Sequence, residues 1–446
     1  MSMQTTTATL EARTAPKGRL SAHVSITTLG QIAAVGLGIF TGVMTARCLG
    51  PQGRGELAAL TLWPMWLFLL ASMGISQATV FYTGKRLYSL SQIWTGSTVI
   101  GAGQSLALLL VGVLVIPLAL RHYSLHVRDL SLVFLLAGPM AIMGAYPASL
   151  LQGQLDFTSF NLIKLAFPFA YAMGLALLFW LGHVSLQGVV VCQIVAYGLA
   201  LAFGYGLLLA KVRIRFVWQS HACLGLFSFG WKTQLGSVSD CINRWSDQLL
   251  LSLFVPPREL GLYAVAVTVA SAVLLIPQGL AIVTLAAGSN QEGAEAGRVI
   301  ARLFRASLLW LLPTCFALFL AARWLTILVF GPAFEDSALA CRILLPGTVA
   351  LGLNQVLYEG ARALGQPAIP SYAQGAAAAV TLLGLYLFVP RFGFIGAAMV
   401  STVAYSCVLI LMLALYRFRL RLSLADLLGV GGVRDLMKTL KPNPRS

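Results

Sequence analysis

The chain has 446 residues, of which 58% are apolar and only 10% are charged, and its mean hydropathy is +0.84. These values exclude an ordinary soluble globular protein and indicate an integral membrane protein whose length is used in repeated apolar segments. The net charge of +16 would suit a nucleic-acid partner. Most basic residues lie beside apolar segments, however, so membrane orientation and anionic lipid explain them better, and we expect no nucleic-acid partner.

The amino-terminal half begins with a polar, basic segment at residues 1–24 that lacks the apolar core and small-residue cleavage site of a signal peptide. We interpret it as a cytoplasmic tail. Apolar runs of about 20 residues follow, each long enough to cross the hydrocarbon core of a bilayer. Six membrane spans are predicted in residues 25–210, at 25–45, 57–81, 93–118, 130–151, 161–181 and 186–209.

A short basic segment, residues 211–223, separates these spans from a second set and is predicted to be a cytoplasmic linker. Six further spans are expected in residues 224–416, at 231–254, 260–286, 306–330, 339–358, 372–389 and 394–416. Residues 417–446 are basic and partly amphipathic, as in a tail that lies on the membrane surface. The predicted fold is therefore an all-α integral membrane protein with about twelve transmembrane helices in two six-helix lobes.

The distribution of basic residues predicts the orientation of these spans. If both ends of the chain are cytoplasmic, most of the 30 Lys and Arg residues fall in cytoplasmic segments. The external loops then contain Arg47, Arg54, Arg121, Arg128, Arg258 and Arg391. An excess of Lys and Arg on the cytoplasmic side is the usual determinant of topology, so we predict cytoplasmic amino and carboxyl ends.

Two short sequence patterns occur once in each half. Residues 51–58 and 257–264 share the pattern P-x-x-x-G-x-x-A after the first span of each half. Gly153-Gln154 after the fourth span is echoed by Gly365-Gln366 after the tenth. Either match alone could arise by chance, because Pro and Gly are common at the ends of spans. Together they suggest an internal repeat of two halves in the same orientation.

The segment 231–254, which opens the second half, carries four charges although it is long enough to cross a bilayer. Its polar residues follow one another at spacings of three and four and form one helical stripe: Lys232, Gly236, Asp240, Asn243, Arg244 and Asp247. A charge at the bilayer centre costs about 2.5 to 3.5 kcal/mol, so the stripe is expected to face other helices or a cavity. A structural ion pair between Asp240 and Arg244 is the simpler alternative.

Other polar or helix-breaking residues inside spans are weaker candidates. Gln31, Gln77 and Gln278 could bind sugar hydroxyls or serve only as hydrogen bonds between helices. Pro64 and Pro277 are candidates for helix bends that let the two halves move. Lys164 is interpreted as a residue that extends its charge toward a membrane surface. The seven scattered cysteines have no metal-ligand spacing, and neither a metal site nor a cofactor is expected.

Several segments resemble one known family. They are TARCLGPQGRGELAAL after the first span, RWSDQLLLSLFVPPRELGLYAVAV at the start of the second half, FGPAF, ALGQP and VPRFGFIGAAMVST. In their order they are similar to polysaccharide-biosynthesis transporters, the lipid-linked oligosaccharide flippases of the multidrug/oligosaccharidyl-lipid/polysaccharide exporter superfamily. The likeness runs through nearly all of residues 25–416. It implies a two-lobed transporter in the bacterial inner membrane whose substrate is an oligosaccharide on a polyprenyl diphosphate.

The substrate that the resemblance implies is multiply anionic, so a binding cavity for it needs cations. Lys232 and Arg244 are the predicted diphosphate contacts, because Lys supplies a point charge and Arg a bidentate fork. Asp240 and Asp247 then either hold Arg244 or titrate and couple transport to protons. A polysaccharide polymerase and export machinery are further implied partners.

Two alternative functions remain at this point. A multidrug antiporter would share the fold, but its cavity should expose acidic or aromatic residues to an organic cation. A polyprenyl-dependent glycosyltransferase or polymerase would need acid and base groups beside its substrate, and no such constellation is visible in the sequence. We therefore expect a transporter and not an enzyme.

Overall fold

The computed structural model describes residues 17–289, 293–366 and 368–419, and in these residues it contains helices and no strands. The amino-terminal half contains α1 (Lys17–Ser72), α2 (Ile75–Lys85), α3 (Leu90–Ala119), α4 (Leu125–Phe134), α5 (Ala137–Gly153), α6 (Phe157–Trp180) and α7 (Leu186–Lys211). The carboxyl-terminal half contains α8 (Ser220–Phe254), α9 (Pro257–Ser271), η1 (Ala272–Leu274), α10 (Leu275–Ser289), α11 (Gly293–Phe330), η2 (Pro332–Phe334), α12 (Ser337–Ala363) and α13 (Ala368–Arg419).

The predicted all-α membrane fold is confirmed. Nine helical stretches of the described residues are long and apolar enough to cross a membrane. Two of these stretches are about twice the usual length, because α1 and α13 continue through a kink at Gly50 and at Gly393. Helix α8 is not among the nine, in keeping with the charges in its second half. The number twelve remains a prediction.

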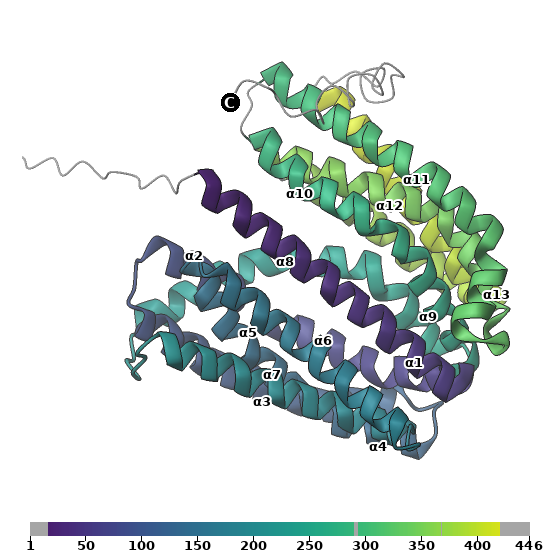
Figure 1. Ribbon diagram of the computed structural model, residues 1–446, viewed down its shortest axis with the longest axis horizontal. Coiled ribbons are helices and arrows are strands. Elements are labelled where there is room, and N and C mark those ends of the chain that lie inside the picture. The colour runs from purple at the N-terminus through teal and green to yellow at the C-terminus, as the bar shows by residue number, and fades with distance from the viewer. Residues whose placement is uncertain (1–16, 290–292, 367, 420–446) are drawn as a thin grey trace, which may run out of the picture.

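The helices gather in two groups (Figure 1). Helices α2 to α7 lie together at the lower left, α9 to α13 lie together at the upper right, and the first part of α1 crosses the front between them. Helix α8 packs against α13 and also against α2 and α3, so it contacts both groups. The division into six-helix lobes remains a prediction. Most of the two predicted tails, 1–24 and 417–446, lies outside the described residues. Their described parts are helical, because residues 17–24 belong to α1 and residues 417–419 to α13.

The repeated pattern P-x-x-x-G-x-x-A forms a reciprocal contact between the two groups. A Cβ atom at Gly55 would lie 1.6 Å from the carbonyl oxygen of Pro257, and one at Gly261 would lie 2.0 Å from that of Pro51. Each glycine therefore lets its helix approach the backbone that begins the other repeat. Such an exchange of identical contacts is what a local two-fold relation produces. The two segments that look alike in the sequence thus pack against each other where α1 meets α9.

The second pair of patterns also has a common structure, but in a different register. Helices α5 and α12 each end in a Schellman motif, in which Leu155 and Gly365 take the left-handed conformation with φ of 65° and 70°. The amide of Asp156 bonds to Leu151 O at 2.9 Å, and that of Gln366 bonds to Ala361 O at the same distance. The structure therefore pairs Gly365 with Leu155 and not with Gly153. The sequence match of Gly153 with Gly365 is therefore two residues out of register.

A break between α1 and α2 creates the meeting point with α8. Met73 and Gly74 have φ of 43° and 64°, which interrupts the helical hydrogen bonds. Gln104 donates to the carbonyl of Ser72 at 3.1 Å, and Gln234 of α8 donates to that of Leu69 at 2.6 Å. Side-chain amides thus satisfy carbonyl groups near the break, as a membrane interior requires.

The start of α6 is fixed by Asp156. Its carboxylate accepts hydrogen bonds from the Ser159 amide at 3.1 Å and from Lys211 Nζ at 2.7 Å. Partial burial by itself would raise the pKa of Asp156, but the hydrogen bonds from Lys211 and Ser159 outweigh it and hold the pKa below its ordinary value. The charge of Asp156 therefore stabilises the fold at neutral pH. This contribution is lost as the pH falls below about 4 and through the folded-state pKa.

Two substitutions should separate the charge of Asp156 from its capping role. Asp156→Asn keeps a good cap but removes the exposed ion pair, so we expect a loss of at most about 1 kcal/mol that disappears at low pH. Asp156→Ala also removes the cap and should cost about 1 kcal/mol more at every pH. Thermal unfolding of the purified protein between pH 7 and 3 measures both effects. An Asp156→Asn deficit that persists unchanged at pH 3 would contradict the assignment.

Candidate functional site

Lys232 and Asp247 are the two residues of the polar stripe predicted on α8 whose side chains the structure describes, and they lie apart. Lys232 is exposed, close to the crossing with the α1–α2 break. The backbone of Asp240, Asn243 and Arg244 is helical, and their side chains lie outside the described part of the structure. Asp247 is buried, about four helical turns beyond Lys232. The predicted pairing of Asp240 with Arg244 therefore stays a prediction.

Asp247 lies in a polar cluster among α8, α9 and α13. Its carboxylate accepts hydrogen bonds from the Tyr263 hydroxyl, from the Ser401 hydroxyl at 3.1 Å and from the backbone N–H of Gln248 at 2.7 Å. All four residues are buried. The described partners of Asp247 are thus neutral donors. Tyr263 and Ser401 lie on other helices, so the sequence alone could not place them beside Asp247. Whether Asp247 also holds Arg244 or titrates stays open.

The remaining predicted residues lie in different places. Gln31 is exposed on α1, and Gln278 is partly buried on α10. Pro277 is buried and follows the 3-10 turn η1, as expected where proline removes a helical hydrogen bond. Pro64 lies inside α1 and lines a cavity described below. Their role as helix bends remains a prediction.

A cavity of about 420 Å³ lies among α2, α5, α6 and α7, and we call it the first cavity. It is hollow because α5 contributes small side chains at helical spacing. These side chains are Ala141, Gly144, Ala145 and Ala148. Larger residues from the neighbouring helices complete the wall, which is membrane-embedded and mainly apolar. The cavity is thus built by residues that the hydropathy of single segments does not distinguish.

Lys164 is the basic residue in the wall of the first cavity, and no acidic residue lines it in the described part of the chain. It lies seven residues into α6, about 10 Å along the helix. Its ammonium group is 4.9 Å from the centre of the Phe160 ring, a cation–π contact. None of the ion pairs among the described residues involves Lys164. The first cavity is therefore electropositive.

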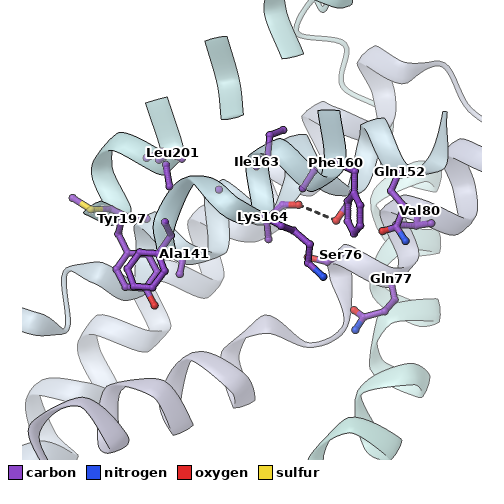
Figure 2. A pocket seen from close by; sticks show the side chains of 17 residues that line it. Ser76, Gln77, Val80, Ala141, Gln152, Phe160, Ile163, Lys164, Tyr197 and Leu201 are labelled. Atoms are coloured by element: carbon purple, nitrogen blue, oxygen red, sulfur yellow. Dashed lines mark hydrogen bonds between the residues drawn. The ribbon is translucent and has the colours of Figure 1, made fainter. Parts of the chain in front are cut away.

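Neutral polar groups lie beside this cation. Figure 2 shows Lys164 with Ser76 and Gln77 of α2 and with Gln152 of α5, while Tyr197 lies toward the other end of the cavity. Ser149 also lines the cavity, but its hydroxyl donates to the Ala145 carbonyl at 2.8 Å. The side-chain amides of Gln77 and Gln152 can both donate and accept hydrogen bonds. The arrangement suits an anion that has further polar substituents.

A second cavity, of about 290 Å³, adjoins the first. Ala141, Phe167 and Tyr197 line both. Its other walls come from α1, α4, α5, α7 and α8. The aromatic residues among them are Trp66, Phe68, Phe134 and Trp245. Because Cys241 and Trp245 belong to α8, the second cavity lies where the first half of the chain meets the second half.

These two cavities join a cationic, polar compartment to an aromatic one, which is the arrangement expected for an amphipathic anion. The sequence alone does not mark Lys164 as a cavity residue, because a lysine near the start of a span commonly extends to the membrane surface. The small residues of α5 were the available signal, but their meaning depends on which helices surround them. The described residues contain no group of three or more His, Cys, Asp or Glu that could hold a metal ion.

Comparison with known proteins gives one family match. The family described as polysaccharide biosynthesis protein matches residues 44–339. This stretch covers the helices that form both cavities. No curated protein sequence matches the chain.

Solved structures of membrane transporters share this fold. An inward-facing multidrug resistance MATE family transporter of the MOP superfamily is 12% identical, with a TM-score of 0.74 over 86% of this chain and 94% of that one. The lipid II flippase MurJ in an inward closed conformation is 15% identical, with a TM-score of 0.72 over 90% and 89%. A MOP superfamily transporter from Pyrococcus furiosus, described as having a binding pocket of reverse polarity, is 15% identical with a TM-score of 0.58 over 92% and 95%. At these identities the likeness shows the fold.

Proposed function

Because the chain belongs to the polysaccharide biosynthesis protein family, we propose that it moves an oligosaccharide linked to a polyprenyl diphosphate from the inner to the outer leaflet of a bacterial inner membrane. The transport would proceed by alternating access of the two halves and would serve the assembly of cell-surface polysaccharide. The observation that carries the proposal is Lys164, a membrane-embedded cation in a cavity without a described acidic residue.

The charge of the first cavity supports a diphosphate over the other substrates considered. A lysine without a nearby carboxylate attracts an anion and repels an organic cation, which argues against a multidrug antiporter. Gln77 and Gln152 can bind the oxygen atoms that surround the phosphate charges. The adjoining aromatic cavity can accept a group bonded to the diphosphate.

A flipping assay tests the proposal. The purified protein is reconstituted in vesicles with undecaprenyl diphosphate that carries one fluorescent sugar, and a membrane-impermeant quencher reports the leaflet of the probe. We expect the protein to equilibrate the probe between leaflets faster than protein-free vesicles do. If the probe stays in its leaflet while ethidium crosses in response to a pH or sodium gradient, the antiporter function replaces ours.

Lys232 and Arg244 remain proposed second contacts of the diphosphate on α8. If they meet the substrate during part of the transport cycle, Lys232→Ala and Arg244→Ala should each slow flipping by about tenfold or more, the loss expected for a charge-assisted hydrogen bond. Lys85→Ala, which removes an exposed lysine at the end of α2, is the matched control. Wild-type rates for both well-expressed variants would remove α8 from the anion site.

A further inference from the structure

Phe167 and Tyr197 stand at the boundary between the two cavities. Their rings are stacked, with centroids 4.0 Å apart and planes inclined by 24°. Phe167 follows Lys164 by three residues on α6, a spacing that places the two side chains about 5 to 6 Å apart at their Cβ atoms. The chemical group bonded directly to an anion held by Lys164 would therefore lie against the rings of Phe167 and Tyr197.

Beyond that boundary, two polar atoms in the wall of the second cavity lack a hydrogen-bond partner. They are the indole Nε1 of Trp66, a donor, and the amide Oε1 of Gln193, an acceptor. The Gln193 side chain also forms a hydrogen bond with Tyr171, which leaves its Oε1 unpaired. Trp63, one turn earlier on α1, shows the usual arrangement, because its Nε1 donates to Ser252 Oγ at 3.2 Å. Buried polar groups are normally paired, so each unpaired atom needs an explanation.

The chemistry of the second cavity discriminates among possible occupants. A polyprenyl chain would pack on the aromatic rings but would leave Trp66 Nε1 and Gln193 Oε1 unpaired. A second phosphate could accept from Trp66, but it has no proton for Gln193 at neutral pH. A pyranose ring can pack on the aromatic rings, accept a hydrogen bond from Trp66 Nε1 and donate one to Gln193 Oε1. Its C–H faces are apolar and pack on aromatic rings, and its hydroxyl groups both donate and accept hydrogen bonds.

We propose that the second cavity binds the sugar residue attached directly to the diphosphate, with Phe167 and Tyr197 packed on the sugar and with Trp66 and Gln193 reading its hydroxyl groups. This inference rests on the proposed function, because it takes Lys164 as the diphosphate contact. It assigns sugar recognition to the meeting point of the first half with α8. The same residues would then distinguish a glycosylated carrier from the bare carrier.

Direct binding of two tritiated lipids to the protein in nanodiscs tests this assignment. The probes are undecaprenyl diphosphate and the same lipid bearing one sugar, prepared with glucose and with N-acetylglucosamine. We expect wild type to bind a glycosylated probe more tightly than the bare lipid. Trp66→Phe keeps a ring but removes the donor and should weaken glycosylated binding about fivefold, the usual effect of one neutral hydrogen bond. Phe167→Leu should weaken it by a similar factor through lost ring contact.

For Trp66→Phe, binding of the bare lipid should stay within about twofold of wild type, because Trp66 lines the second cavity and not the first. Phe167 lines both cavities, so Phe167→Leu is judged by the ratio of the two affinities, which should fall. Trp63→Phe is the matched control, since it removes an indole donor that already has a partner outside the cavity, and the ratio of the two affinities should not change. Gln193→Met, which removes the acceptor, provides a second independent variant.

Three results would overturn the assignment. Equal affinity of wild type for bare and glycosylated lipids would remove sugar binding while leaving the proposed function intact. Equal weakening of both probes by Trp66→Phe or Phe167→Leu would assign the aromatic wall to the carrier chain or to structure. Failure of wild type to bind either lipid would remove the proposed function as well, and the two failures are thereby distinguishable.

Discussion

A Lys164→Met variant is expected to flip the polyprenyl-diphosphate-linked sugar at least about tenfold more slowly than wild type. Methionine keeps an unbranched, flexible side chain of similar length but has no charge. Hydrogen bonds to a charged group contribute about 1.5 to 3 kcal/mol, which corresponds to roughly a tenfold to 150-fold change in an equilibrium or rate. Lys164 is the basic residue among the described residues of the first cavity wall, so no neighbour there replaces it.

Two further variants make this result specific. Lys164→Arg keeps the charge and should retain more activity than Lys164→Met. Lys85→Met removes an exposed charge of the same kind outside the cavity and should flip at the wild-type rate. Gel filtration of each purified variant before reconstitution controls for folding. The vesicles are then compared at matched protein content. Normal flipping by Lys164→Met would show that the diphosphate binds elsewhere, and the α8 cations Lys232 and Arg244 would become the leading candidates.

The largest structural effect is expected at the crossing of the two repeats. Gly55→Ala would place a Cβ atom 1.6 Å from Pro257 O, and Gly261→Ala would place one 2.0 Å from Pro51 O. Both opposing atoms belong to backbone and cannot rotate away. Each substitution must separate α1 from α9, so we expect a loss of at least about 3 kcal/mol, at the upper end of overpacking effects, or no folded protein.

Thermal unfolding and the yield of monodisperse protein measure the effect of these glycine substitutions. Gly103→Ala is the matched control, because nothing lies within 4 Å of a Cβ atom at this position of α3. Alanine favours helix by up to about 1 kcal/mol over glycine, so this control should be neutral or slightly stabilising. The double variant should lose less than the sum of the single losses, because one separation relieves both clashes. Wild-type stability of Gly261→Ala would mean that the helices do not approach this closely.

The crossing also bears on the proposed transport cycle. Two halves that exchange identical contacts at one point can rotate about it while their outer parts separate. A further contact joins the groups nearby, since Arg47 of α1 donates to the Val329 carbonyl near the end of α11 at 2.7 Å. Arg47 also contacts the Leu328 carbonyl. A basic side chain at a helix carboxyl end is favourable, so this contact helps to hold the observed arrangement.

Several features of the fold could be read from the sequence because they depend on local composition. Apolar runs of the right length predict membrane helices, and the high mean hydropathy of the chain alone excludes a soluble globular protein. The repeat at residues 51–58 and 257–264 was visible because close packing demands glycine at fixed positions. The continuation of the first span into the second within α1, through the kink at Gly50, was not predicted. The break at Met73 and Gly74, which divides the second predicted span (57–81) between α1 and α2, was not predicted either.

The candidate site was harder to predict than the helices. The sequence drew attention to α8 because four charges in one span are conspicuous, and the structure shows that this helix contacts both groups of helices. The role predicted for its charges remains a prediction. It did not identify Lys164, whose importance comes from the absence of an acid on three neighbouring helices. It also could not show that Asp247 meets Tyr263 and Ser401, since these residues are separated by long stretches of chain.

By itself, the sequence determined that this is a membrane protein, that it is helical and which family it belongs to. Each of these follows from the order of apolar, basic and small residues along the chain. Only the tertiary structure decided where a substrate could bind. A cavity is the space that several helices leave between them, and its charge is set by side chains that face the same volume. Neither property exists along a single helix, so Lys164 lines a cavity only because α2, α5, α6 and α7 are assembled around it.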